Sequence, residues 1–162
     1  MEDNDILNGK KILIVDDEPD ILGSLEDLLY MCDTDQAEAY EGAMQLLQRE
    51  TYDAAILDIM GVRGYDLLEE TTRRGIPTLM LTAHALSSDN FVKSIKSGAQ
   101  AYVPKDRISE IAVFLRDVLE AKQDREKRPM WFTRLENFFE EKFGADWRDK
   151  QGQEFWKKYF YI

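Results

Sequence analysis

The sequence predicts an α/β protein with a doubly wound, five-stranded parallel sheet and a short α-helical extension at the C-terminus. Two observations lead to this fold class. Short runs of mostly apolar residues alternate five times with segments whose apolar residues recur at helical spacing, a pattern typical of a parallel sheet covered by helices. Four of the runs end in polar or charged residues, and functional groups gather at the carboxyl ends of strands in such sheets.

The first strand is expected over 11–15, an apolar run that ends in Asp16 and Asp17. Pro19 follows, and proline fits the first turn of a helix. We therefore predict a helix over 19–31. Its apolar face consists of Ile21, Leu22, Leu25, Leu28 and Leu29.

The second strand and helix carry a weaker pattern. A strand is expected over about 35–40, although residues 36–39 have low β-propensity. The second helix is expected over 42–49, with Ala43, Leu46 and Leu47 on one face. This strand is the least regular of the sheet.

The central strand is expected over 52–60, where a mostly apolar run delivers Asp58 close to its end. Gly61 and Gly64 come next, so the run fits a buried parallel strand that opens into a loop. A short third helix over 65–74 should end at Gly75, because glycine is common just after a helix.

The last two strands are expected over 77–81 and 101–104, and they lead into Thr82 and Lys105. A fourth helix over about 89–97 lies between them. A fifth helix should be capped by Ser109. Its stripe consists of Ile111, Phe114, Leu115, Val118 and Leu119. With right-handed crossovers, the simplest arrangement is a sheet of flavodoxin-like order.

The composition changes near the C-terminus. The charged run 122–128 is predicted to continue the fifth helix into solvent until Pro129 interrupts it. The last 41 residues hold 11 of the 18 aromatic residues, too many for a solvated tail. We divide the chain into a domain over 1–124 and an aromatic-rich helical extension over 125–162.

The extension is expected to form two short helices with apolar stripes that need a surface to cover them. The first stripe contains Trp131, Leu135, Phe138, Phe139 and Phe143, and the second contains Phe155, Trp156, Tyr159 and Phe160. We predict an interaction module that makes a homodimer, either through the extension or through the face of the fifth helix. Docking on its own domain and binding in a partner's groove are the alternatives.

Charge and cysteine content narrow the functional classes. The net charge is −11, and residues 1–121 carry −13 of it against +2 for residues 122–162. Such an acidic body argues against DNA as a partner. Cys32 is the only cysteine, so no internal disulfide can form. Neither a secretory signal nor an apolar run of membrane-spanning length is present, so we predict a cytoplasmic protein without a membrane partner.

The residues at the strand ends form an ordered set. Asp16 and Asp17, then Asp58, then Thr82 before Ala83, and finally Lys105 three positions after Tyr102 occur in this order. In this set the chain resembles the receiver domain of two-component response regulators. The resemblance covers about 10–121 and is specific, because five chemically distinct positions match in order.

The resemblance implies a phosphoacceptor role for Asp58, with Lys105 and the Thr82 hydroxyl balancing the charge of the phosphoryl group. The implied donor is a phosphohistidine on a sensor histidine kinase or a phosphotransfer protein. The chain would then be no enzyme in the usual sense, since it catalyses only its own phosphorylation and dephosphorylation. The implied function is a phosphorylation-dependent response regulator that signals by protein association.

The resemblance also implies a bound Mg²⁺. Asp17 and Asp58 would be direct ligands, Asp16 would act through water, and the backbone carbonyl of Met60 would complete the protein ligands. Crowded carboxylates repel one another, and a hard divalent cation relieves that repulsion. No other cofactor is expected.

A conformational switch that pairs Thr82 with Tyr102 is the remaining implication. A half-buried edge aromatic is the structural alternative for Tyr102, and an exposed loop residue is the better interpretation of His84. Three positions differ from the family or vary within it. Pro104 precedes Lys105 instead of following it, and Met60 and His84 occupy the two variable positions beside the phosphoryl group.

Three other functions compete with this one. An aspartate-dependent Mg²⁺ phosphohydrolase uses similar groups, but its second acid would stand at position 60, where this chain has methionine. A transcription factor would need a basic recognition element that the short extension does not offer. A phosphorylation-independent scaffold would leave the five matching residues without a use.

Overall fold

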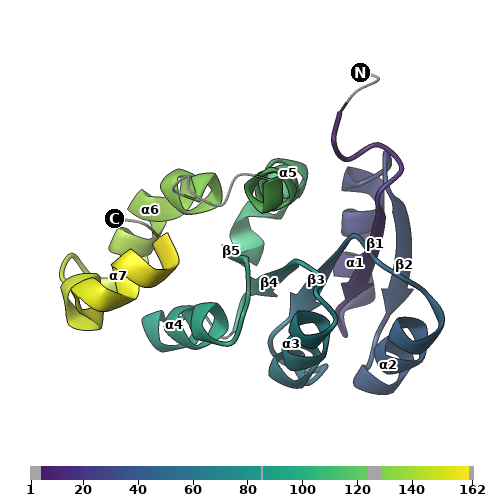
Figure 1. The fold of residues 1–162 in the computed structure, drawn as a ribbon, viewed down its shortest axis with the longest axis horizontal. Coiled ribbons are helices and arrows are strands. Elements are labelled where there is room, and N and C mark those ends of the chain that lie inside the picture. Colours follow the sequence, from purple (N-terminus) through teal and green to yellow (C-terminus); the bar gives the residue numbers. More distant parts are fainter. Residues whose placement is uncertain (1–4, 85, 124–128, 161–162) are drawn as a thin grey trace.

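Five parallel strands form one sheet in the order β2-β1-β3-β4-β5 in the computed structural model of the chain (Figure 1). The strands are β1 (Lys11–Val15), β2 (Asp33–Ala37), β3 (Ala54–Asp58), β4 (Thr78–Thr82) and β5 (Ala101–Pro104). The structure describes residues 5–84, 86–123 and 129–160. This strand order and direction confirm the predicted doubly wound, flavodoxin-like sheet.

Helices cover both faces of the sheet. Helices α1 (Pro19–Leu28) and α5 (Ile111–Gln123) contact each other on one face. The other face carries α2 (Tyr40–Arg49), α3 (Gly64–Arg73) and α4 (Ser88–Lys96), which run along the bottom of Figure 1. This two-sided cover explains why the strands read as continuous apolar runs rather than as alternating patterns.

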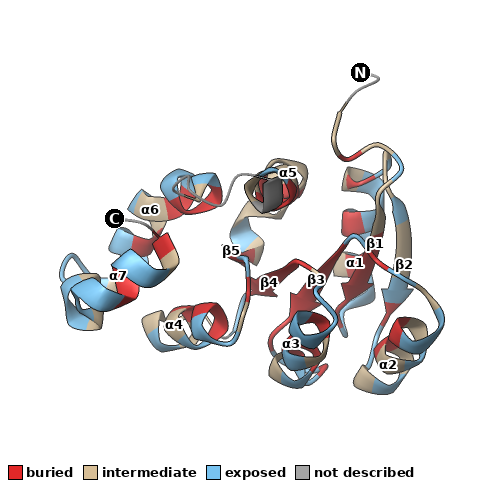
Figure 2. Cartoon of the chain, viewed as in Figure 1, coloured by how far each residue is buried: buried red, intermediate tan, exposed pale blue. Residues whose placement is uncertain are grey.

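The core follows the middle of the sheet. All residues of β3 and β4 are buried, whereas β2 at the edge is mostly partly buried or exposed (Figure 2). The central strands are therefore fixed on both sides and both faces. They give the residues at their carboxyl ends a rigid support.

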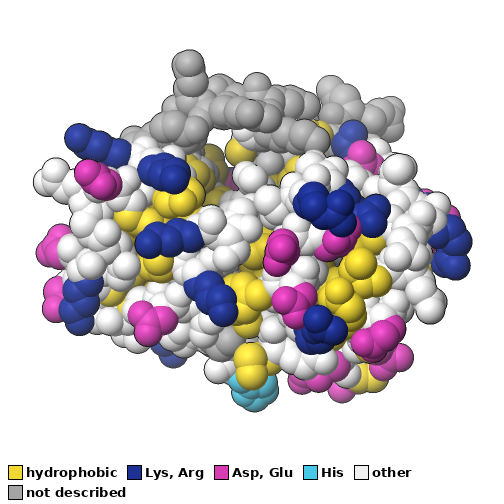
Figure 3. All heavy atoms as spheres, turned by 60° about the horizontal axis from the view of Figure 1, so that its bottom comes forward, with side chains coloured by type: hydrophobic (Ala, Val, Ile, Leu, Met, Phe, Trp, Pro, Cys, Tyr) yellow, Lys and Arg dark blue, Asp and Glu magenta, His cyan; other side chains and the backbone are white. Residues whose placement is uncertain are grey.

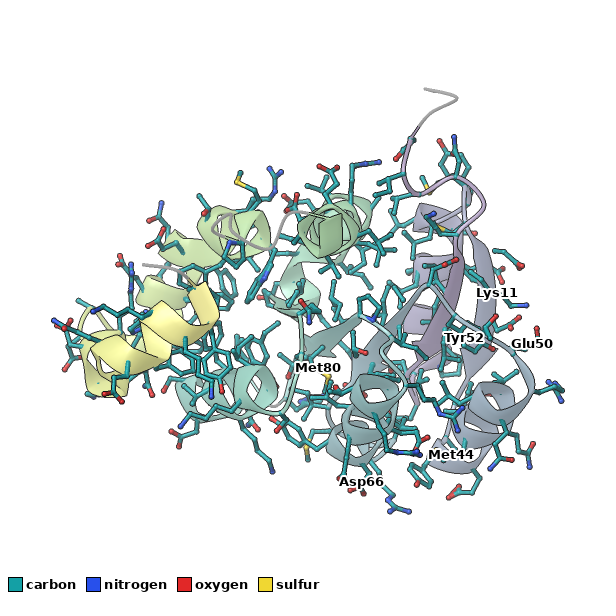
Figure 4. All side chains as sticks on the ribbon, viewed as in Figure 1. Lys11, Met44, Glu50, Tyr52, Asp66 and Met80 are labelled. Atoms are coloured by element: carbon teal, nitrogen blue, oxygen red, sulfur yellow. The ribbon has the colours of Figure 1, made fainter. Side chains whose placement is uncertain are left out.

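Polar groups at the amino ends of the strands are satisfied by one another. Lys11 and Glu50 point toward each other (Figure 4), with 2.6 Å between Nζ and Oε1. The nearby Tyr52 hydroxyl donates a hydrogen bond of 2.7 Å to Asp35. These pairs are separate from the strand ends expected to carry function.

The structure corrects several expected boundaries. The second strand ends at Ala37, and Tyr40 begins α2 instead of ending the strand. The central strand spans five residues rather than 52–60. Ser109 does not cap the fifth helix, because it lies inside the 3₁₀ turn Lys105–Glu110 that precedes α5. The lysine loop needs this extra turn to lead from β5 into the helix.

The C-terminal segment forms the two helices that the sequence predicts. They are α6 (Met130–Phe143) and α7 (Gln153–Phe160), joined by a loop with a short 3₁₀ turn, Asp149–Gln151. In Figure 1 they lie beyond β5, beside α4 and α5, and α6 contacts both β5 and α5. The extension therefore covers the β5 edge of the sheet.

Aromatic side chains fill the space between the extension and the sheet. We define the aromatic cluster as the buried rings that meet there. They are Phe91 and Tyr102 from the predicted domain and Trp131, Phe132, Phe139, Trp147, Trp156 and Phe160 from the extension. Tyr102 is fully buried, so the interpretation as a half-buried edge aromatic is wrong.

Most of the rings that motivated self-association are thus buried within one chain, as the alternative of docking on its own domain required, and Phe138, Phe143 and Tyr159 are partly buried. Homodimerisation stays a prediction, and it would need a surface other than the aromatic cluster. Helix α5 extends to Gln123, and the rest of the predicted continuation, 124–128, lies outside the described residues.

Candidate functional site

Three strand ends bring charged side chains to one edge of the sheet. Asp16 follows β1, Asp58 is the last residue of β3, and Lys105 follows β5. Parallel pairing aligns these ends: Asp58 lies beside Leu81, and the next residue, Thr82, lies beside Pro104. The fold therefore gathers at one edge the residues that the sequence places at separate strand ends.

Lys105 is at the centre of this group. Its Nζ atom lies 2.7 Å from Glu18 Oε2, 2.9 Å from Asp16 Oδ2 and 3.5 Å from Asp58 Oδ1. The lysine side chain is only 8% exposed, so this ammonium is largely shielded from water. We call Asp16, Asp17, Glu18, Asp58 and Lys105 the acidic pocket.

Burial and charge perturb both central groups. Burial, reinforced by the negative charge of Asp16, raises the pKa of Asp58 to about 6. Burial alone would lower the pKa of Lys105, but hydrogen bonds to Glu18 and Asp16 outweigh it and raise that pKa. Asp58 is thus a carboxylate near neutral pH, held beside an ammonium that stays charged.

The two acids that flank Asp17 differ in environment. Burial raises the pKa of Asp16, which is 1% exposed. The hydrogen bond from Lys105 lowers the pKa of Glu18, which is largely exposed. Asp16 also accepts a hydrogen bond of 2.9 Å from the backbone N–H of Glu18, so the turn before α1 holds the buried carboxylate in place.

The same turn offers oxygen ligands for a cation. Among the described residues, the carboxylates of Asp16, Asp17 and Glu18 can place one oxygen each within 4.8 Å of the others. Several carboxylate oxygens beside open solvent suit Mg²⁺, which keeps part of its water shell. The residues present therefore fit a hard divalent cation, with Glu18 joining the two predicted aspartates.

The loop after β3 approaches this cluster closely. Gly61 has a φ of +86°, and a Cβ atom built on it would lie 2.2 Å from Asp17 Oδ2. Only glycine therefore lets the backbone come so near the carboxylate. The preceding residue, Met60, is 56% exposed, and the role of its backbone carbonyl stays a prediction.

The remaining predicted residues border the pocket or lie behind it. Thr82 is buried at the end of β4, and His84 is exposed on the surface as expected (Figure 3). Tyr102 lies three residues before Lys105 but belongs to the aromatic cluster, and its hydroxyl hydrogen-bonds to the backbone of Ser87.

Sequence reasoning missed two participants. Glu18 is not among the predicted site residues, although its position just before Pro19 at the start of a helix was a usable signal. The hydrogen bonds of Ser87 with Tyr102 join residues 15 positions apart. No local sequence pattern predicts such a contact.

Comparisons with known proteins agree with this geometry. The family model described as "Response regulator receiver domain" matches residues 12–115. The chain is 35% identical over 105 residues to the response regulator protein PilR of Pseudomonas aeruginosa, covering 61% of this chain and 23% of that protein. It is 34% identical over 116 residues to the heme response regulator HssR of Staphylococcus aureus, covering 66% and 50%.

Solved structures show the same likeness. A CheY-like receiver domain protein from Methanospirillum hungatei aligns with a TM-score of 0.65 and 27% identity, over 73% of this chain and 99% of that one. The signal receiver domain of an HD domain-containing protein from Pseudomonas fluorescens aligns with a TM-score of 0.64 and 26% identity, over 72% and 98%.

The likeness is partial on both sides. The chain spans half or less of the length of the two curated relatives, and the family match ends before α6 and α7 begin. No helix within the described ranges has the length and apolar character needed to cross a bilayer.

Proposed function

The chain belongs to the response regulator receiver domain family of two-component signalling, and we propose that Asp58 accepts a phosphoryl group from a sensor histidine kinase or a phosphotransfer protein. The observation that carries the proposal is the Lys105 ammonium, 3.5 Å from Asp58 and shielded from water. A preorganised cation beside a carboxylate is what a phosphoryl group arriving there requires, since transfer depends mainly on positioning and charge balance.

Each residue has a defined part in this proposal. A carboxylate oxygen of Asp58 attacks phosphorus, the bond from phosphorus to the donor's imidazole nitrogen breaks, and the electron pair leaves with that nitrogen. Lys105 moves from Asp16 and Glu18 toward the new phosphoryl oxygens, and the Thr82 hydroxyl donates a hydrogen bond to one of them. Water later attacks the same phosphorus, the bond from phosphorus to the Asp58 oxygen breaks, and inorganic phosphate leaves while the carboxylate is restored. The chain thus acts on its own phosphoryl group.

A divalent cation fits the same proposal. Asp17, Asp58 and the Met60 carbonyl would hold Mg²⁺, and Asp16 and Glu18, whose carboxylates lie beside that of Asp17, would act through its water ligands. When bound, it neutralises charge on the transferring group. With the charge of Asp16 balanced in this way, Lys105 would be available to contact the phosphoryl oxygens.

We further propose that the output is protein association in the cytoplasm and that DNA is not the partner. The acidic body, with −13 over residues 1–121, supports this. In Figure 3 lysine, arginine and acidic side chains are interspersed on the visible face. This mixture supports a protein partner over a polyanion.

The decisive experiment is intact mass after incubation with Mg²⁺ and acetyl phosphate. We expect one added phosphoryl group on the wild-type chain and none on Asp58→Asn, because an amide is a poor nucleophile. Asp53→Asn, at the opposite end of β3, is the matched control and should be modified like the wild type. An unmodified wild-type chain with verified folding would refute the proposal.

A further inference from the structure

Two rings of the predicted domain, Phe91 and Tyr102, contact the extension. Phe139 of α6 lies 5.2 Å from Phe91 of α4 and 6.1 Å from Tyr102 of β5, measured between ring centroids. Phe91 and Tyr102 meet edge to face at 5.5 Å. All three side chains are fully buried. The Tyr102 ring is therefore held between one ring of its own domain and one ring of the extension.

The hydroxyl of the held tyrosine fixes a second element. Tyr102 accepts a hydrogen bond of 3.2 Å from the N–H of Ser87 and donates one of 3.3 Å to the carbonyl of Ser87. Ser87 is also the N-cap of α4, where its side chain accepts a hydrogen bond of 3.0 Å from the N–H of Asn90. One tyrosine thus restrains both backbone groups of the residue that begins α4.

Ser87 stands only five residues after Thr82. Thr82 is fixed at one end of this short connection by β4, and Ser87 is fixed at the other end by Tyr102. Restraint at the second end lowers the conformational entropy that the connection can lose when a ligand is bound. The aromatic cluster can act on the acidic pocket without touching it.

We propose that Phe139 is a positioning residue for the candidate site: by holding Tyr102 and through it Ser87, the docked extension prepares Thr82, at the carboxyl end of β4, for a phosphoryl group. The choice of a phosphoryl group as the ligand rests on the proposed function. The contacts among Phe139, Tyr102 and Ser87 do not depend on it. The extension then favours occupancy of the site. By linkage, an occupied site favours docking of the extension by the same factor.

The chain offers a matched pair of variants. Phe139→Leu removes a ring of the extension that contacts Tyr102. Phe155→Leu removes a ring of similar burial whose ring contacts, within the described part of the chain, are with Trp156, Tyr159 and Phe160. Both changes loosen the extension, but only the first loosens the hold on Tyr102. Tyr102→Phe keeps the ring and deletes the hydroxyl.

Amide hydrogen exchange of the full-length chain tests the contacts without any ligand. Phe139→Leu and Tyr102→Phe should each speed exchange at the start of α4, Ser87–Phe91, by about tenfold, as a loss of roughly 1.4 kcal/mol in local protection corresponds to a factor of ten. Phe155→Leu should leave that segment at the wild-type rate. Equal acceleration by both phenylalanine variants, or by neither, overturns the proposal.

Calorimetric titration with Mg²⁺ and beryllofluoride tests the linkage to the site. We expect Phe139→Leu to weaken binding about fivefold, at the lower end of typical allosteric couplings. Tyr102→Phe should weaken it similarly, and the double variant should lose little more. An unchanged affinity in Phe139→Leu overturns the linkage while leaving the proposed function standing. Failure of the wild type to bind beryllofluoride overturns the proposed function, and the exchange experiment still decides the positioning role.

Discussion

The acidic pocket and the aromatic cluster meet at one strand but have opposite effects on stability. The pocket holds two aspartates that are at least 94% buried beside one lysine, an arrangement that costs desolvation energy. The cluster holds rings with almost no exposed surface, and their burial contributes to stability. β5 supports both regions, because it contains Tyr102 of the cluster and leads directly into Lys105 of the pocket. A site kept ready for a charged ligand is thus supported by an apolar cluster next to it.

The largest effect should come from a hole in the aromatic cluster. Phe132 is fully buried and packs 4.8 Å from Phe160. Phe132→Ala should lower the free energy of unfolding by about 3–5 kcal/mol, since a large core side chain leaves a cavity. Urea unfolding followed by circular dichroism measures this loss.

The matched control is Tyr30→Ala, because Tyr30 is 71% exposed. It should change the same free energy by less than about 0.5 kcal/mol. All three tryptophans, Trp131, Trp147 and Trp156, belong to the extension. If Phe132→Ala unfolds the tryptophan environment well before the rest, the cluster does not stabilise the sheet as argued.

Removing the charge of Asp58 from the pocket should instead raise the free energy of unfolding. Because the pKa of Asp58 is raised from 3.8 to about 6, the folded state binds this proton more tightly than the unfolded state. That contribution is fully present below pH 3.8 and is lost as pH rises through 6. At pH 7 and without Mg²⁺, Asp58→Asn should therefore be more stable by about 1–3 kcal/mol.

Thermal unfolding between pH 4 and pH 8 tests the sign. The difference in melting temperature between Asp58→Asn and the wild type should increase as pH rises and should decrease when Mg²⁺ is added. Asp27→Asn, which removes a charge at an exposed position of α1, is the control for a general effect of net charge. A difference that is constant with pH would mean that desolvation of Asp58 is not what destabilises the pocket.

Two glycine variants, one of them in the loop beside the pocket, should distinguish the effect of backbone strain from the effect on ligand binding. Gly61→Ala places a Cβ atom 2.2 Å from Asp17 Oδ2 at a φ of +86°. Gly75→Ala has a φ of +74° with nothing within 4 Å. Both should lose about 1–2 kcal/mol of stability from the left-handed backbone.

Only Gly61→Ala should also weaken Mg²⁺ binding, by about tenfold, because Asp17 must move away. Calorimetric titration of Mg²⁺ into both variants makes the comparison. Equal weakening in the two variants would show that strain alone, and not contact with Asp17, governs the site.

Much of the pocket could be predicted because strand ends are a local property. Asp16, Asp58, Thr82 and Lys105 each follow a readable apolar run, and parallel pairing brings such ends together. Glu18 was not predicted as a partner of Lys105, because the reach of a long side chain depends on where the other strands place it. The fold class could be predicted for the same reason. Helices cover both faces of the sheet, so most strands are continuous apolar runs whose ends can be recognised in the sequence.

The cluster was predicted only in part. The stripe around Phe139 correctly indicated a buried helix, but an apolar stripe does not specify its partner. Phe91 and Tyr102, which receive it, lie in segments whose own patterns fit an ordinary helix and strand. The second strand was misplaced by a few residues, because polar edge residues such as Asp33 and Gln36 carry little β-signal.

The smallest effect should come from the charged contact between the two helices at the seam. Arg134 of α6 donates hydrogen bonds of 2.6 and 3.1 Å to the two carboxylate oxygens of Asp117 in α5. The arginine is 39% exposed but Asp117 is only 8% exposed, so water screens the pair from one side, and Arg134→Ala should cost about 1 kcal/mol in urea unfolding. If docking of the extension depends on apolar contacts, this variant should bind beryllofluoride like the wild type, in contrast to Phe139→Leu. A loss as large as that of Phe132→Ala would instead make the ion pair, and not the rings, the principal link between the extension and the sheet.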